Sequence, residues 1–173
     1  VLVGLTPLEE DEVIRGLRQR VVGEFARHEE ETAIVELLPE KDDHNAQGAR
    51  DIVLVAPPYL PYPDGWRQAS VDFARVHLVD ASPRDALWAA EQCLRSGSLA
   101  AVLCWPRQAD DRALRRLQVA SETGQSLGFA FRDVRASDNP SPAALRVQFE
   151  QAQGAMQLRV LKCRGAQPPA QAL

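Results

Sequence analysis

Several kinds of site depend on residues that this sequence lacks. The chain has two lysines, Lys41 and Lys162, and neither lies in the G-x-x-x-x-G-K-[ST] loop that holds nucleotide phosphates. It has no G-x-S-x-G turn for a serine nucleophile, and its three histidines show no metal-ligand spacing with one another or with cysteine. We therefore expect a protein that is not an enzyme and has no catalytic residue, cofactor or metal ion.

Cysteine and long apolar runs are scarce too. The three cysteines, Cys93, Cys104 and Cys163, are far apart and include no C-x-x-C pair. This spacing is typical of reduced, mostly buried thiols in a cytoplasmic protein rather than of a disulfide framework. His77 lies inside an expected strand, which favours a structural role. No stretch approaches the roughly 18 consecutive apolar residues of a membrane-spanning helix, so we expect no membrane partner.

Acidic residues are concentrated at the start of the chain. Residues 1–50 hold 12 acidic and 6 basic residues, whereas residues 51–173 hold 12 acidic and 14 basic ones. An apolar residue at every fourth position predicts an amphipathic helix over 6–31, and the composition of 32–38 predicts a short strand. We interpret 1–50 as an acidic, helical N-terminal segment.

From residue 51 the pattern alternates between strands and helices. Short apolar runs predict buried parallel strands at 52–56, 76–80 and 99–105. Three more strands are expected, at 126–132, 144–150 and 156–164. The last two alternate apolar and polar residues, which predicts a half-exposed antiparallel edge. The fold class is therefore α/β, a RecA-like, mainly parallel sheet with helices on both faces and C-terminal antiparallel edge strands.

Capping residues mark the two helices between these strands. Ser82 and Asp85 form an S-x-x-D box at the start of a helix over 82–97, and Gly97 is expected to stop it. Asp110 is the expected cap of a second helix over 109–124. Both helices follow an expected strand, as in a parallel sheet.

One loop concentrates the aromatic residues of the sequence. The stretch APPYLPYPDGW, residues 56–66, contains both tyrosines of the chain and four prolines. Because proline restricts its own backbone and that of the preceding residue, we expect an extended, stiff segment. We predict that Tyr59 and Tyr62 are surface anchors for a protein partner and that Trp66 packs against the protein; the alternative is that all three rings cover the sheet edge.

Four arginines form the second candidate site. Arg107 precedes the expected helix over 109–124, and Arg112, Arg115 and Arg116 fall on one side of it. This pattern is typical of a solvated face, of a DNA contact or of a contact with an acidic partner. Of the two functional alternatives, we expect the protein contact.

Five segments of the chain resemble the ImuA family, the RecA/SulA-like accessory proteins of bacterial mutagenesis operons. They follow one another in the family's order over 51–165: DIVLVAPPYLPYPDGW, RDALWAAEQCLRSGSLAAVLCWP, DDRALRRLQVASETGQSLGFAFR, NPSPAALRV and LRVLKCRG. The resemblance implies a RecA-like core over 51–165, and we expect the residues beyond it, 166–173, to form a flexible tail. It does not extend to 1–50, where the family usually has a region like the RecA ATP-binding segment.

The resemblance also implies a function and partners. It implies a non-catalytic adaptor, induced by DNA damage, that assembles proteins for translesion synthesis. The implied partners are ImuB, which is an inactive relative of Y-family polymerases, an error-prone C-family polymerase, and RecA. The alternatives are a regulator resembling SulA that binds the division protein FtsZ, and a degenerate ATPase that acts on DNA. The sequence leaves the oligomeric state open, a homo-oligomer included.

Overall fold

The structure is a computed structural model that describes residues 33–38, 50–68, 71–152 and 155–168. The helix expected over 6–31 lies outside these residues. The described strands are β1 (Ala33–Leu38), β2 (Asp51–Val55), β3 (Val76–Val79), β4 (Leu99–Cys104), β5 (Leu127–Asp133), β6 (Leu145–Ala152) and β7 (Ala155–Cys163). The described helices are α2 (Pro63–Gln68), α3 (Ala86–Arg95) and α4 (Asp111–Gly124), with 3-10 turns η1 (Phe73–Arg75) and η2 (Val134–Ala136).

The strands form one sheet in the order β3-β2-β4-β5-β1-β6-β7. Strands β3, β2, β4 and β5 pair in parallel, and β1, β6 and β7 continue the sheet with antiparallel pairing. The expected class is confirmed: an α/β fold with a mainly parallel part and antiparallel strands at the C-terminal end of the chain.

Strand β1 comes from the segment before residue 51 but lies inside the sheet. It is paired with β5 on one side and with β6 on the other, so that Val35 is opposite both Phe131 and Val147. The N-terminal segment therefore supplies the strand that joins the parallel part to the antiparallel part.

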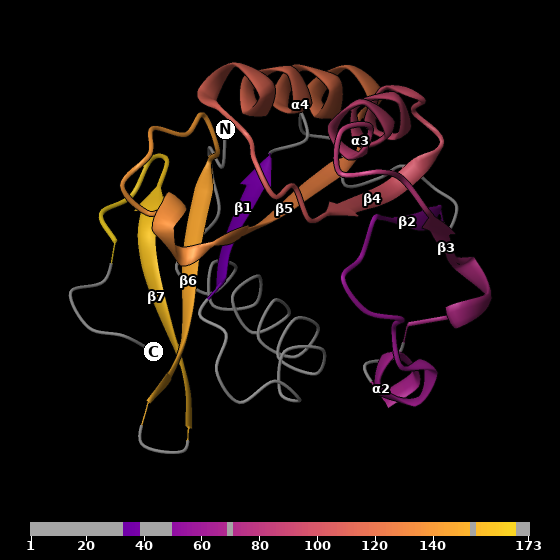
Figure 1. Ribbon diagram of the computed structural model, residues 1–173, viewed down its shortest axis with the longest axis horizontal. Coiled ribbons are helices and arrows are strands. Elements are labelled where there is room, and N and C mark those ends of the chain that lie inside the picture. The colour runs from indigo at the N-terminus through magenta and orange to yellow at the C-terminus, as the bar shows by residue number, and fades with distance from the viewer. Residues whose placement is uncertain (1–32, 39–49, 69–70, 153–154, 169–173) are drawn as a thin grey trace.

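Helices α3 and α4 lie side by side on one face of the sheet, and the short α2 lies below β2 and β3 (Figure 1). Side chains alternate between the two faces of a strand, so the sheet separates two cores. Under α3 and α4 the core is made of small and medium residues, such as Val53, Ala90 and Leu117. The second core contains larger rings, among them Phe149 and the stacked pair Trp105 and Phe131, whose ring centroids are 4.7 Å apart.

Two strands differ from the expected burial. The run at 76–80 forms an edge strand, β3, in which no residue is fully buried, because only β2 pairs with it in the described sheet. The run at 144–150 forms β6, which is buried rather than half-exposed, since it lies between β1 and β7. Its polar residue Arg146 is 7% exposed and donates to the backbone carbonyls of Ala136, Ser137 and Asn139. A strand with alternating apolar and polar residues has a solvent-exposed face only where its polar side chains make no hydrogen bonds inside the protein.

The helix caps agree with the sequence in part. Asp110 is the N-cap of α4, and its carboxylate accepts a hydrogen bond from the backbone N–H of Ala113 at 2.7 Å. Ser82 Oγ accepts a hydrogen bond from the backbone N–H of Asp85 at 3.3 Å, as in the expected box, but the N-cap of α3 is Asp85, which makes no side-chain capping hydrogen bond, and the helix begins at Ala86. Gly97 has a left-handed φ of 72°, which fits its expected role after the end of α3.

A glycine at the end of a helix is usually the residue with left-handed φ that stops it, but Gly124 does not have this role. The left-handed residue after α4 is Gln125, with φ of 49°, and Gly124 belongs to the last turn. A Cβ atom at Gly124 would lie 1.8 Å from the carbonyl oxygen of Leu94. Glycine is therefore required here because the C-terminal turn of α3 approaches the backbone of α4.

Candidate protein-contact site

The aromatic loop, residues 56–62, leaves the sheet at the carboxyl end of β2. Ala56 begins it with a left-handed φ of 49°, which strains a residue that has a Cβ atom. Its backbone N–H donates to the carbonyl of Val79 at 2.9 Å, which ties the start of the loop to the end of β3. The loop thus begins from a fixed point at the edge of the sheet where parallel strands end, where open α/β sheets usually bind their ligands.

Two prolines hold the far end of the loop. Pro61 is buried, and Pro63 is the first residue of α2. The expectation of an extended segment through residue 66 is wrong for 63–66, which belong to α2, because a helix does not need the N–H that proline lacks at its first position. The carbonyl of Tyr62 accepts hydrogen bonds from the backbone N–H groups of Gly65, at 3.1 Å, and Trp66, at 3.4 Å. The loop therefore ends in a short helix that orients Tyr62.

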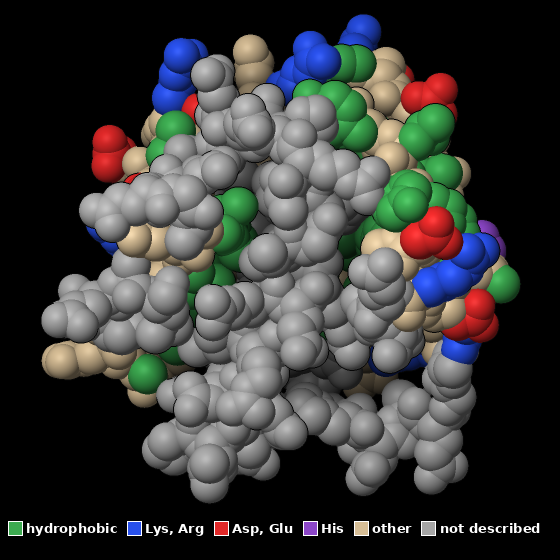
Figure 2. Space-filling model, turned by 90° about the horizontal axis from the view of Figure 1, so that it is seen from below, with side chains coloured by type: hydrophobic (Ala, Val, Ile, Leu, Met, Phe, Trp, Pro, Cys, Tyr) green, Lys and Arg blue, Asp and Glu red, His purple; other side chains and the backbone are tan. Residues whose placement is uncertain are grey.

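The side chains between these fixed points are exposed. Tyr59 is 53% exposed, Leu60 85% and Tyr62 47%, whereas Trp66 is half-buried. Seen from below, hydrophobic side chains of the described residues gather among charged ones on the side of the molecule where Figure 1 draws β2, β3 and α2 (Figure 2). The sequence analysis did not single out Leu60, although its place between the two tyrosines was a signal.

The predicted arginines lie on another part of the molecule. Arg107 is exposed in the connection between β4 and α4, and Arg112, Arg115 and Arg116 are exposed on α4 itself. Helix α4 lies above the sheet in Figure 1, whereas the loop after β2 runs below it. The aromatic loop and the arginine helix are thus separate surfaces, and they do not form one site.

Two of the arginines already have acidic partners. Arg116 contacts the carboxylate of Glu91 on α3, which Arg95 also contacts at 2.8 Å. Arg115 lies 3.5 Å from Asp111 one turn earlier on α4. Arg107 and Arg112 form no ion pair with another described residue. The charge available to a partner on α4 is therefore greatest at Arg112.

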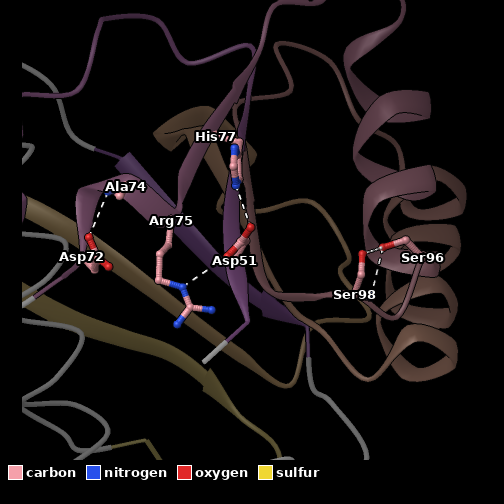
Figure 3. Close-up of polar contacts among 7 residues, drawn as sticks. All are labelled: Asp51, Asp72, Ala74, Arg75, His77, Ser96 and Ser98. Atoms are coloured by element: carbon pink, nitrogen blue, oxygen red, sulfur yellow. Dashed lines mark hydrogen bonds and ion pairs between the residues drawn. The ribbon is translucent and has the colours of Figure 1, made fainter. Parts of the chain in front are cut away.

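Asp51, Arg75 and His77 form a cluster of polar contacts at the edge of the sheet. Asp51 at the start of β2 contacts His77 Nε2 at 2.8 Å and accepts from Arg75 Nε at 3.2 Å (Figure 3). The hydrogen bond with His77, followed by that from Arg75, lowers the pKa of the Asp51 carboxyl below its ordinary value. His77 thus has a polar partner, as expected of a structural histidine. It is nevertheless half exposed, because β3 is an edge strand.

The cysteines and acidic groups of the described residues show no further arrangement that suggests chemistry. Cys104 is buried, and burial raises the pKa of the Cys93 thiol. Among the residues that the structure describes, no three His, Cys, Asp or Glu side chains are placed to hold a metal ion. In the same residues no helix is both long and apolar enough to cross a membrane.

The fold and the loop describe an α/β protein with an exposed aromatic segment at the carboxyl edge of its parallel strands. No protein-family model and no curated protein matches the sequence. Among solved structures, the crystal structure of SulA from Pseudomonas aeruginosa is similar to this chain, with 22% identity and a TM-score of 0.44. The similarity covers 72% of this chain and 88% of the SulA chain.

Proposed function

We propose that this protein is a non-catalytic adaptor that assembles translesion synthesis proteins after DNA damage. The proposal combines the resemblance of 51–165 to the ImuA family with one structural observation. That observation is the exposure of Tyr59, Leu60 and Tyr62 on a loop fixed at both ends.

Physical chemistry explains why such a loop suits a protein contact. Tyrosine supplies a large, rigid, partly apolar surface, and tyrosines are enriched among the residues that dominate binding energy at interfaces. A side chain on a fixed backbone also loses less conformational freedom on binding than one on a flexible loop. The aromatic loop has both properties, since Ala56 and α2 fix its ends.

The inactive Y-family polymerase relative is the proposed partner of the aromatic loop. Purified chain would be titrated by calorimetry, in separate experiments, with this partner, with the C-family polymerase and with FtsZ. We expect saturable binding of at least one translesion protein and none of FtsZ. Binding of FtsZ alone would overturn the adaptor and favour a division regulator.

Nucleotide binding gives an independent check on the non-catalytic part of the proposal. The sequence has no phosphate loop, so we expect no saturable binding of Mg-ATP and no hydrolysis. Micromolar binding of ATP in the same calorimeter would show that the chain has a nucleotide site.

A further inference from the structure

The outer face of the α3–α4 pair exposes two apolar side chains. Trp88 on α3 is 62% exposed and Val119 on α4 is 51% exposed. A tryptophan is seldom so exposed, because it has the largest apolar area to remove from water. Neither residue belongs to either of the two cores that the sheet separates.

The ion pair that joins the two helices lies close in sequence to Trp88 on α3 and to Arg112 on α4. The pair of Glu91 with Arg116 and the close approach of Leu94 to Gly124 show that the helices run in the same direction. Trp88 is about one turn before Glu91, as Arg112 is about one turn before Arg116. Trp88 and Arg112 are therefore each within about one turn of the ion pair that joins the two helices.

This face also carries unused positive charge. Arg95 and Arg116 share the single carboxylate of Glu91, whose side chain is only 8% exposed, while both guanidinium groups are more than half exposed. Arg112 forms no ion pair with another described residue. Trp88 and Val119 thus lie among cations whose charge the neighbouring acids only partly neutralise.

We infer that the outer face of α3 and α4, defined by Trp88, Val119, Arg95, Arg112 and Arg116, binds an acidic segment of a partner protein that also carries apolar side chains. Apolar groups of the segment pack on Trp88 and Val119, and its carboxylates pair with the guanidinium groups around them. This surface is separate from the aromatic loop, and the inference does not depend on which protein the loop binds.

The acids near this face favour a peptide over a nucleic acid. Asp85, Asp110 and Asp111 lie at the amino-terminal ends of α3 and α4 and would repel a continuous line of phosphates. A short acidic segment can place its few charges where the cations are and avoid these aspartates.

The test uses a dye-labelled synthetic peptide of repeated Glu-Glu-Leu units and measures its fluorescence anisotropy with the full chain. We expect saturable binding that Trp88→Ala and Arg112→Glu each weaken by about fivefold or more. Arg159→Glu is the matched control, because it reverses an exposed arginine on β7 that lies 4.0 Å from Glu150 and outside the α3–α4 face. It should change the affinity by less than about twofold, since a distant exposed charge is largely screened.

Three results would overturn the inference. One is the absence of saturable peptide binding, and another is equal binding by the parent, Trp88→Ala and Arg112→Glu. The third is tighter binding of single-stranded oligothymidylate than of the peptide, lost in Arg112→Glu, which would make this face a nucleic-acid surface. Both changed side chains are exposed, so circular dichroism should show folded variants.

Discussion

The α3–α4 layer and the aromatic loop differ in which side chains they bury: the helix layer buries small ones, whereas the loop leaves large rings exposed. Between the helices several buried positions are small, such as Ala86, Ala90 and Gly124, and the backbones approach closely at Gly124. In the loop two tyrosines are about half exposed. A protein gains stability by burying large rings, so the loop aromatics contribute little to folding where they are. The comparison supports the proposal that the helix layer serves stability and that the loop serves contact.

The largest effect is expected from Gly124→Ala in the helix layer. The added methyl group would lie 1.8 Å from the Leu94 carbonyl oxygen, so α3 and α4 must move apart. We expect unfolding by urea to show a loss of about 3 kcal/mol or more, in the upper range for an overpacked core. The control is Gly65→Ala, whose new methyl group would meet the Tyr62 ring at an ordinary 3.6 Å. If the two variants were equally stable, the close packing of the helices would be wrong.

Glu91→Gln would sharpen the comparison at the same helix pair. Glu91 is nearly buried and joins Arg95 on α3 with Arg116 on α4, so its charge ties the helices together. Because both arginines are more than half exposed to water, we expect a loss of about 1–2 kcal/mol rather than that of a fully buried pair. Asp111→Asn, which removes an exposed acid 3.5 Å from Arg115, should cost less than about 0.5 kcal/mol in the same urea titration.

Removing the N-cap side chain of α4 should also lower the free energy of unfolding, by less than Glu91→Gln does. Asp110→Ala removes the carboxylate that accepts from the Ala113 N–H, and the expected loss in free energy of unfolding is about 1 kcal/mol. Asp110→Asn keeps an acceptor oxygen and should recover most of that loss in thermal melts. A loss as large in Asp110→Asn as in Asp110→Ala would show that the hydrogen bond to Ala113 is not the cause.

The smallest effect concerns pH at the sheet edge. The pKa of Asp51 is lowered in the folded protein, so its contribution to stability is present above the ordinary aspartate pKa and lost as pH falls through the lowered one. We expect Asp51→Asn to flatten slightly the acid side of the stability–pH curve, measured by urea unfolding between about pH 2 and 5. An effect confined to higher pH would contradict the assignment to this carboxyl.

Sequence patterns predicted those parts of the molecule that local rules decide. The capping role of Asp110 and the stop at Gly97 depend on neighbours within one turn of a helix, and the structure has both. The place of β1 depends on pairing with residues of β5 and β6 that are ninety or more positions away, so no local sequence pattern could predict it. The half-exposed edge expected at 144–150 did not anticipate a buried Arg146, because the backbone carbonyls that accept from it lie outside the strand, in the turn at 136–139.

At the candidate site the sequence indicated the location of the loop but not its structure. Composition alone marked the loop around Tyr59 and Tyr62, because rings and prolines are rare together in an ordinary connection. It did not predict the helix that begins at Pro63 or the separation of the loop from α4, since both depend on the three-dimensional arrangement. The shared use of Glu91 by two arginines required knowledge of which helices are neighbours.

The claim that the loop serves contact rather than stability is tested most directly by the double variant Tyr59→Ala/Tyr62→Ala. Its free energy of unfolding and its affinity for the inactive Y-family polymerase relative would be measured on the same preparation. We expect stability to change by less than about 1 kcal/mol, because both rings are about half exposed, and binding to weaken by about 2 kcal/mol or more. A loss of about 3 kcal/mol in stability with unchanged binding would contradict the account and make the two tyrosines part of the packed structure.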